Sequence, residues 1–246
     1  MKKVLVFGSS GMLGDYLCKL LQEKGYEVER SDRAEGGIDI TDEQQVRDTV
    51  YESKAEYVVN CAAYTNVEKA EDEKEIAFKV NAEAPKYMAN TCKELNIPFI
   101  HISTDYVFGE NKEDGYTEEY RNFNPLNVYG ESKLKGEENV LGEGGNSYIF
   151  RTSWLFGPNA TNFIDALEEK IGPGIYHVCS KDSLSRYEFA KEILSMQDIK
   201  TPIKECKLED FPRKAVVPHT SILLNTKLDE ARTSAEMLEE YFSDKI

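Results

Sequence analysis

The sequence lacks the features that mark nucleic-acid-binding, membrane-spanning and secreted proteins. It has no run of Lys or Arg, and 45 acidic residues against 30 basic ones give it a formal net charge of −15. This balance argues against nucleic acid or an anionic membrane as the main partner. No apolar run approaches membrane-spanning length, and the four apolar residues from Val4 to Phe7 are too few for a signal peptide. We therefore expect a cytoplasmic protein.

Paired cysteines are also missing. The five cysteines are odd in number and scattered, with no C-x-x-C motif: Cys18, Cys61, Cys92, Cys179 and Cys206. This pattern is typical of reduced thiols that pack as small apolar residues in a cytosol. The hydrophobic fraction of 40% and the charged fraction of 30% describe a globular chain, and 246 residues can bury a sizeable core.

A glycine-rich loop follows the first apolar run. Lys3 to Phe7 has the composition of a strand buried on both faces of a parallel sheet, and a helical stretch from Asp15 to Lys24 follows the loop G-S-S-G-M-L-G. Its three glycines have the spacing that allows a tight turn, a close pyrophosphate and close packing of helix on strand. The free N–H groups of the helix would face the anion. We assign cofactor contacts to Gly8, Ser10, Gly11, Met12, Leu13 and Gly14.

The end of the second predicted strand, Glu27 to Ser31, leaves the choice of cofactor open. Asp32 lies 18 residues past Gly14, near the position where an acid takes the adenosine ribose hydroxyls of NAD. Arg33, beside it, is equally suited to the 2′-phosphate of NADP. Further on, Asp39 and Ile40 are either adenine contacts or a plain strand end before a helix cap.

Small and polar residues follow the next strands. Residues 55–63 predict a strand that ends in Cys61, Ala62 and Ala63, which leave room for a ligand beside Thr65. Two further predicted strands end at Thr104 and at Ser153, so their carboxyl ends meet the glycine loop at one sheet edge. The acidic helical segment from Val67 to Leu95, which precedes both of these strands, contains Asn81. Asn81 is a surface residue, a cap or a functional group, and we count it among the expected cofactor contacts.

Tyr129 and Lys133 lie four residues apart on a predicted helix and therefore on one face of it. An ammonium group near a phenol favours the phenolate, so we expect the pKa of Tyr129 to fall below its usual value of about 10. The hydroxyl of Thr104 could bind a carbonyl oxygen while Tyr129 protonates it. The polar stretch 109–124 is expected to form a flap above this site.

These elements predict an α/β fold, a Rossmann-like doubly wound parallel sheet; a small, shortened C-terminal substrate-binding part is what the family resemblance described next implies. We expect residues 1–157 to form the NAD(P)-binding domain and residues 158–246 a reduced substrate-binding region interleaved with it.

The motifs together resemble the extended short-chain dehydrogenase/reductase superfamily and, more narrowly, the dTDP-4-dehydrorhamnose reductase family. The likeness covers nearly the whole chain and rests on VLVFGSSGMLG, HISTDYVFGE, PLNVYGESKLKGE, FRTSWLFGP, GIYHVC and SRYEFAKEIL. It implies NADPH-dependent reduction of the C4 keto group of dTDP-4-dehydrorhamnose, a dTDP-4-keto-6-deoxy sugar, with NADH as an open alternative.

The resemblance also implies roles for single residues. Tyr129 would be the general acid, Lys133 would hold the nicotinamide ribose, and Thr104 would bind the substrate oxygen. The substrate set would be Thr65, Ser103, Thr104, Asp105, Val107 and Trp154. Members of the family often pair through helices and hold Mg²⁺; a homodimer is therefore open, and we assign no metal site because Asp15 is the one nearby candidate.

Two departures from the family pattern concern the substrate side. Between Asn162–Leu167 and Gly174–His177 only Glu168–Pro173 remains, where the family has a helix, a strand and a second helix. Val217 stands where the family usually has an arginine that meets the nucleotide-sugar diphosphate. His219, Arg213 or Lys214 could compensate. We expect the shortened chain to expose an apolar sheet edge and part of the substrate cleft.

Several functions therefore stay open at this point. The chain is a compact but active reductase, a nucleotide-binding regulatory subunit without turnover, or an altered gene product of an ordinary reductase. A reductase or epimerase of another nucleotide sugar is a further alternative, because the fold alone does not discriminate among these.

Overall fold

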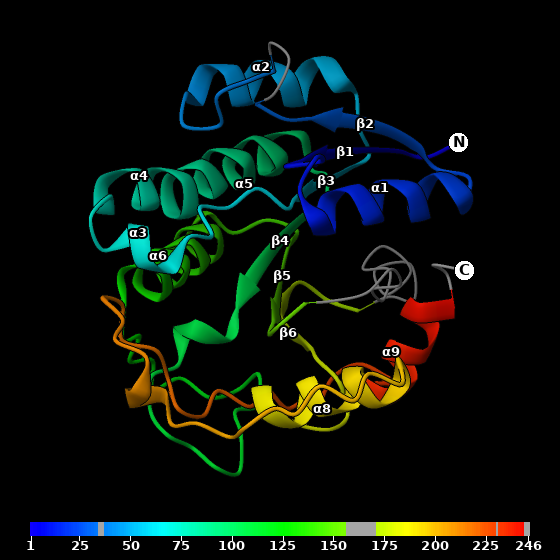
Figure 1. The fold of residues 1–246 in the computed structure, drawn as a ribbon. Coiled ribbons are helices and arrows are strands. Elements are labelled where there is room, and N and C mark those ends of the chain that lie inside the picture. The colour runs from blue at the N-terminus through cyan, green and yellow to red at the C-terminus, as the bar shows by residue number, and fades with distance from the viewer. Residues whose placement is uncertain (34–36, 156–170, 230, 244–246) are drawn as a thin grey trace.

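The computed structural model describes residues 1–33, 37–155, 171–229 and 231–243. Its centre is a six-stranded parallel sheet with the strand order β2-β1-β3-β4-β5-β6 (Figure 1). The strands are β1 (Lys3–Phe7), β2 (Glu27–Ser31), β3 (Tyr57–Asn60), β4 (Phe99–Thr104), β5 (Ser147–Thr152) and β6 (Gly174–Val178). The expected doubly wound α/β sheet is confirmed.

Helices cover both faces of this sheet. On one face lie α2 (Glu43–Ser53), α5 (Ala84–Leu95) and α6 (Val128–Glu143), whose apolar side chains pack with Leu5 and Phe7 of β1. On the other face α1 (Met12–Glu23) packs against the alternate residues Val4 and Val6. Because successive side chains of a strand point to opposite faces, β1 supplies apolar side chains to both layers.

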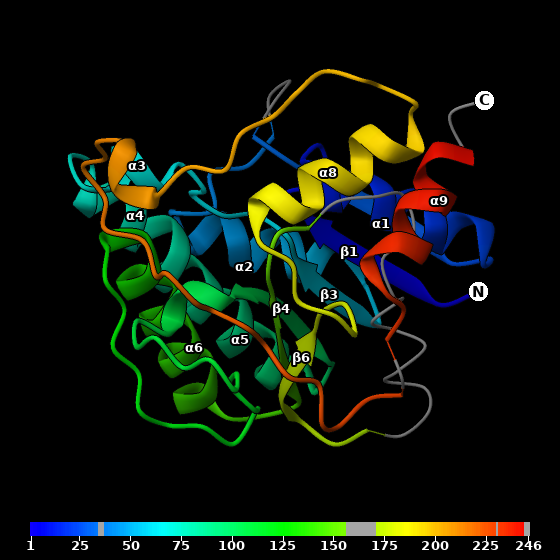
Figure 2. The same ribbon diagram turned by 60° about the horizontal axis from the view of Figure 1, so that its bottom comes forward.

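The remaining elements are helices and short helical turns. They are α3 (Val67–Ala70), α4 (Lys74–Phe78), the π-helical turn η2 (Lys79–Glu83), η3 (Asp105–Val107), α8 (Arg186–Met196), η4 (Leu208–Asp210) and α9 (Ser234–Ser243). Helices α8 and α9 lie side by side, and the chain after α8 crosses the molecule to reach α3 and α4 (Figure 2). No helix among the described residues is long and apolar enough to cross a bilayer.

The polar stretch 109–124 is anchored along its length, which corrects the expectation of a flap. Tyr116 is fully buried, stacks on Phe108 with ring centroids 4.2 Å apart, and pairs as an isolated bridge with Leu223. Its N–H donates to the Ile222 carbonyl at 2.8 Å, and its carbonyl accepts from Leu224 at the same distance. A buried aromatic ring and two backbone hydrogen bonds fix this loop to the C-terminal segment.

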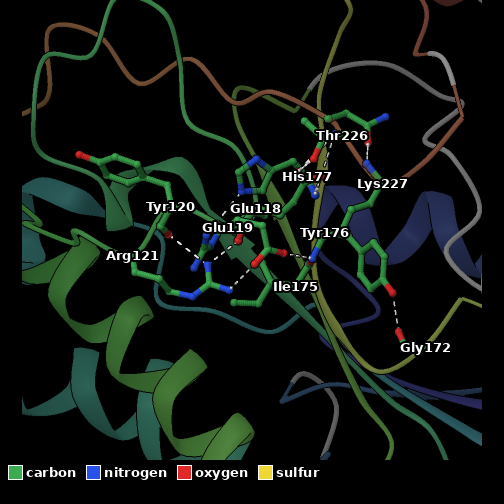
Figure 3. Close-up of polar contacts among 12 residues, drawn as sticks. Glu118, Glu119, Tyr120, Arg121, Gly172, Ile175, Tyr176, His177, Thr226 and Lys227 are labelled. Atoms are coloured by element: carbon green, nitrogen blue, oxygen red, sulfur yellow. Dashed lines mark hydrogen bonds and ion pairs between the residues drawn. The ribbon is translucent and has the colours of Figure 1, made fainter.

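The free edge of β6 is covered by side chains, which corrects the expectation of an exposed sheet edge. Glu118 accepts a hydrogen bond from the His177 N–H at 3.3 Å, and Lys227 donates to the Ile175 carbonyl at 3.2 Å (Figure 3). Glu118 is fully buried and also binds the hydroxyl of Thr226 at 2.6 Å. These charged groups replace the hydrogen bonds that a further strand would make. The shortened region that we expected, residues 162–173, lies mostly outside the described residues, and Asn162–Leu167 lies wholly outside them.

Candidate active site

The glycine loop approaches the end of β3 so closely that side chains cannot fit there. Gly8 has φ +74°, and a Cβ on it would lie 2.5 Å from the Ala62 nitrogen; a Cβ on Gly14 would lie 2.1 Å from the Gly8 oxygen. Gly11 caps α1 without a side-chain hydrogen bond. The first N–H groups of this 12-residue helix are therefore left to an anion, and the residues present fit the pyrophosphate of a dinucleotide.

At the end of β2, Asp32 lies beside this loop. Its Oδ2 atom accepts hydrogen bonds from Ser10, from the N–H at 2.9 Å and from the hydroxyl at 2.5 Å, and the neighbouring Arg33 is exposed. Asp39 instead caps its own turn, because its carboxylate accepts from both the N–H and the hydroxyl of Thr41. These hydrogen bonds hold the pKa of Asp39 below its usual value. The next residue, Ile40, packs against the core.

Asn81 connects the segment after β3 to α6. It is buried within η2, where its amide oxygen accepts from the Tyr64 N–H at 2.8 Å and its amide nitrogen donates to the Tyr64 carbonyl at 3.1 Å and to the Ser132 hydroxyl at 3.0 Å. Gly136 permits the close packing, since a Cβ there would lie 2.1 Å from the Asn81 carbonyl oxygen. Such π-helical turns are frequent at functional sites. We had not singled out Ser132, although it stands between Tyr129 and Lys133.

A cavity of about 300 Å³ opens at the carboxyl ends of β4 and β5. Its lining consists of Thr65, Val67, Thr104, Asp105, Tyr106, Tyr129, Trp154 and Leu155. Two members of the expected substrate set lie elsewhere. Ser103 donates to Glu137 at 2.5 Å in the interior, and Val107 is fully buried in the cluster around Phe108.

Glu137 belongs to a buried ion pair beneath the cavity. It binds Arg151 through two hydrogen bonds, of 2.9 and 2.5 Å, and both side chains are almost fully buried. The guanidinium also lies 5.0 Å from the ring centroids of Phe108 and Phe123. This pair fixes α6 against β5 and so helps to place Tyr129 beside β4.

The pKa of Tyr129 differs from our expectation. Burial raises it to about 12, and a hydrogen bond with Thr104 opposes the shift only in part. Lys133 does not lower it, because the Lys133 Nζ donates to the Ile102 carbonyl at 2.6 Å and lies 3.4 Å from His101 Nε2. The phenol is therefore protonated at neutral pH, which is the form that a general acid requires.

Lys133 and Asp105 are the other shifted groups of the site. Burial lowers the pKa of Lys133 to about 8 and raises the pKa of Asp105 to about 6. Asp105 accepts hydrogen bonds from the hydroxyls of Thr104 and Ser221, so Ser221, Asp105, Thr104 and Tyr129 form one connected series.

Arginines stand at the mouth of the cavity. The Arg186 guanidinium lies 4.3 Å from the ring centroid of Trp154, a residue with φ +45°, and hydrogen-bonds the Tyr106 phenol. The charge of Arg213 also acts on Tyr106. Val217 is buried, whereas Lys214 is paired with Asp72 and His219 lies 3.6 Å from Glu209.

No metal centre is found in the part of the chain that the structure describes, because no three His, Cys, Asp or Glu residues there could hold an ion. Asp15 binds Lys19 at 2.7 Å and Arg30 at 3.0 Å. The Asp15 carboxylate therefore lies between two cationic side chains.

Comparison with known families gives a match over nearly the whole chain. The family model described as the RmlD substrate binding domain matches residues 1–171 and again residues 165–242. The two matches meet at 165–171, where we expected the missing segment.

Known proteins resemble the chain over its full length. The spore coat polysaccharide biosynthesis protein SpsK of Bacillus subtilis is 31% identical over 281 positions, which cover 100% of this chain and 98% of that protein. A dTDP-4-dehydrorhamnose reductase of Mycolicibacterium smegmatis is 31% identical over 94% of this chain and 80% of its own length. Since 281 positions are aligned with 246 residues, 35 positions have no residue here.

Solved structures agree with these matches. The dTDP-4-dehydrorhamnose reductase of Clostridium acetobutylicum has a TM-score of 0.91 at 32% identity, with 99% of both chains covered. The reductase of Bacillus anthracis, solved in complex with NADP, has a TM-score of 0.91 at 30% identity and covers 99% of this chain and 100% of its own.

Proposed function

The chain belongs to the dTDP-4-dehydrorhamnose reductase family, whose model is described as the RmlD substrate binding domain, and on this premise we propose that it reduces the C4 keto group of dTDP-4-dehydrorhamnose with NADPH. One observation carries the proposal: Thr104 and Tyr129 face a single cavity at the sheet edge that also holds the glycine loop. In open α/β sheets ligands bind at this edge.

The residues that would hold the cofactor come from three strand ends. The Gly8–Gly14 loop and the N-terminus of α1 would bind its pyrophosphate, and Asp32 and Arg33 its adenosine ribose. Cys61, Ala62, Ala63 and Thr65 would border the nicotinamide, with Lys133 on its ribose. When bound, the nicotinamide supplies the hydride for the substrate C4 atom.

The protein's own part in the reaction is to supply and stabilise a proton. Tyr129 donates its phenolic proton to the C4 oxygen, which becomes the hydroxyl of the product. Thr104 turns its one hydroxyl proton from Asp105 to the same oxygen and so polarises the carbonyl group. Because burial keeps Tyr129 protonated, the acid is available before the substrate binds. Asn81 orients the segment after β3 through Tyr64, and α6 through Ser132.

Arg186 and Arg213 are suited to the diphosphate of the substrate. Both act on Tyr106, which lines the cavity, and a guanidinium binds phosphate oxygens through two parallel hydrogen bonds. Of the three residues that we considered as replacements for an arginine at Val217, Lys214 and His219 lie against carboxylates. Of the three, Arg213 is therefore the candidate for the diphosphate contact. Arg186 is a second candidate, which we had not predicted from the sequence.

The test is turnover by the purified protein. With dTDP-4-dehydrorhamnose and NADPH, the absorbance of NADPH should fall in proportion to dTDP-L-rhamnose formed. Tyr129→Phe should lower kcat by about 10²–10⁴-fold, because it removes the proton donor and keeps the ring. NADPH affinity, measured by fluorescence titration, should be unchanged. Equal rates for the wild type and this variant would refute the proposal.

A different dTDP-4-keto sugar is the second candidate for the substrate. It is favoured by the shortened segment and by Val217, both on the substrate side of the site. A protein of Streptomyces niveus, named dTDP-4-keto-6-deoxy-D-glucose reductase, is 37% identical over 65% of this chain. Comparing kcat/KM for the two keto sugars on one preparation decides which of them is the substrate. If neither is turned over but nucleotide still binds tightly, the result favours a regulatory subunit.

A further inference from the structure

A series of buried polar groups leads from the end of β3 to Lys133. The Ala62 N–H donates to the Asn60 Oδ1 atom at 3.0 Å, and Asn60 Nδ2 lies 3.2 Å from His101 Nδ1. On the other side of the ring, His101 Nε2 lies 3.4 Å from Lys133 Nζ. Asn60 and His101 have no exposed surface and Lys133 has 2%. Donors and acceptors must therefore match along the series.

This matching locates the proton on His101. The Ala62 N–H requires an acceptor, so the amide oxygen of Asn60 faces it and the amide nitrogen, a donor, faces the ring. His101 Nδ1 must then accept, which places the ring proton on Nε2 in the neutral imidazole. Burial and the neighbouring Lys133 lower the pKa of His101 well below its usual value, so the ring stays neutral.

The protonated Nε2 atom points at Lys133, which must accept from it. An ammonium group has three donors and no acceptor, whereas a neutral amine has a lone pair for Nε2–H and can still donate to the Ile102 carbonyl at 2.6 Å. Two other groups act on this amine: Glu137, one turn further along α6, and Cys61, after β3, both favour its charged form. Burial opposes them and dominates.

We propose that His101, oriented by Asn60, is a positioning residue that stabilises Lys133 as the neutral amine and couples the protonation of Lys133 to the backbone at Ala62. When Lys133 takes up a proton from solvent, Nε2 can no longer donate to it. The ring proton must move to Nδ1, so that Nε2 accepts from the ammonium; the ring gains and loses one proton and stays neutral. Nδ1–H then faces the Asn60 amide nitrogen, which is also a donor. The Asn60 amide must turn its oxygen to the ring, and the hydrogen bond from the Ala62 N–H to that oxygen is lost.

The consequence for the reaction, which rests on the proposed function, concerns cofactor binding. Ala62 lies against Gly8 of the pyrophosphate loop, since a Cβ on Gly8 would come within 2.6 Å of the Ala62 Cα atom. When a cofactor binds this loop and Lys133 together, Lys133 should therefore exchange a proton with solvent. Lys133 thus reports its charge to the loop through two side chains that have no exposed surface.

Nitrogen-15 NMR of the imidazole rings tests the proposal without substrate or turnover. The chain has three histidines, and His101→Gln identifies the signals of His101. At pH 9.5 we expect Nε2 to be protonated and Nδ1 not. As the pH is lowered, the proton should move to Nδ1 with a midpoint near pH 8, where Lys133 titrates, and the ring should remain neutral. A tautomer that is constant from pH 6.5 to 9.5, or an imidazolium in that range, would overturn the proposal.

Two variants separate this coupling from a packing role. Lys133→Met removes the ammonium, so His101 should keep the Nε2 proton at every pH. Asn60→Asp offers a carboxylate oxygen to Nδ1–H and should fix the proton on Nδ1, and the alkaline limb of kcat/KM should move up by about one pH unit. A matched control is His219→Gln, in an exposed residue, which should alter neither reading. A tautomer that still changes with pH in Lys133→Met, or a proton that stays on Nε2 in Asn60→Asp, would also refute the coupling.

Discussion

Breaking the buried ion pair between Glu137 and Arg151 should cost several kilocalories per mole of unfolding free energy, and a neighbouring surface pair provides a built-in comparison. Arg151 has no exposed surface and Glu137 has 2%, and two hydrogen bonds join them. Glu137→Gln would keep the shape of the side chain but leave a guanidinium buried without its counter-charge. Breaking a buried pair in this way costs about 3–5 kcal/mol of unfolding free energy.

The control is the next residue of the same helix. Glu138 pairs with Lys135 at 2.8 Å, and more than half of each side chain is exposed, at 55% and 52%. Water screens such pairs, so Glu138→Gln should cost less than about 1 kcal/mol. Urea unfolding followed by circular dichroism gives both values under one condition. If the two variants unfold at the same urea concentration, burial does not determine the strength of these pairs and the reasoning fails.

Three further predictions concern the site. Arg186→Gln should raise KM for the dTDP-sugar by about tenfold or more and leave NADPH affinity unchanged, because a charge-assisted hydrogen bond contributes about 1.5–3 kcal/mol; equal KM values would exclude a diphosphate contact. Arg33→Ala should weaken NADPH by a similar factor and leave NADH unaffected in calorimetric titrations, since only NADPH carries the 2′-phosphate. The carboxyl of Asp105 has a folded pKa of about 6 against 3.8 for the free group, so the folded state holds its proton to higher pH. Unfolding free energy should therefore fall as pH rises from about 4 to 6, by about 1–3 kcal/mol, and urea titrations of Asp105→Asn should lack this component.

The sheet and the glycine loop could be predicted from the sequence because their determinants are local. Gly8 and Gly14 stand at a spacing that only a close turn explains, and a Cβ on either would clash with backbone. The apolar runs alternate with helical stretches, which predicts parallel strands.

The predictions that proved wrong concern how deeply side chains are buried and in which direction they point. Helical spacing predicted that Tyr129 and Lys133 share one helix face, but it did not predict how deeply that face is buried. Burial reversed the expected direction of the Tyr129 pKa shift. Ser103 and Thr104 were both assigned to the substrate, although neighbouring residues of a strand point to opposite faces. Ser103 accordingly points to Glu137, away from the cavity.

Contacts between distant parts of the chain were the least predictable. The expected flap is held by the pairing of Tyr116 with Leu223, and the expected open edge is covered by Glu118 and Lys227. Nothing in the local composition around these residues marks them as partners, because the contacts join residues that lie 52 to 107 positions apart in the sequence. Arg186 escaped notice for the same reason, since its neighbour Trp154 belongs to another strand end.

The covering of β6 also bears on how the protein avoids self-association. An incoming β-strand from a second molecule could hydrogen-bond to this edge only by displacing a carboxylate that is wholly removed from water and an ammonium bound to a main-chain oxygen. Displacement would leave the Thr226 hydroxyl and N–H without their acceptor. Polymerisation by strand addition is thus opposed at this end of the sheet.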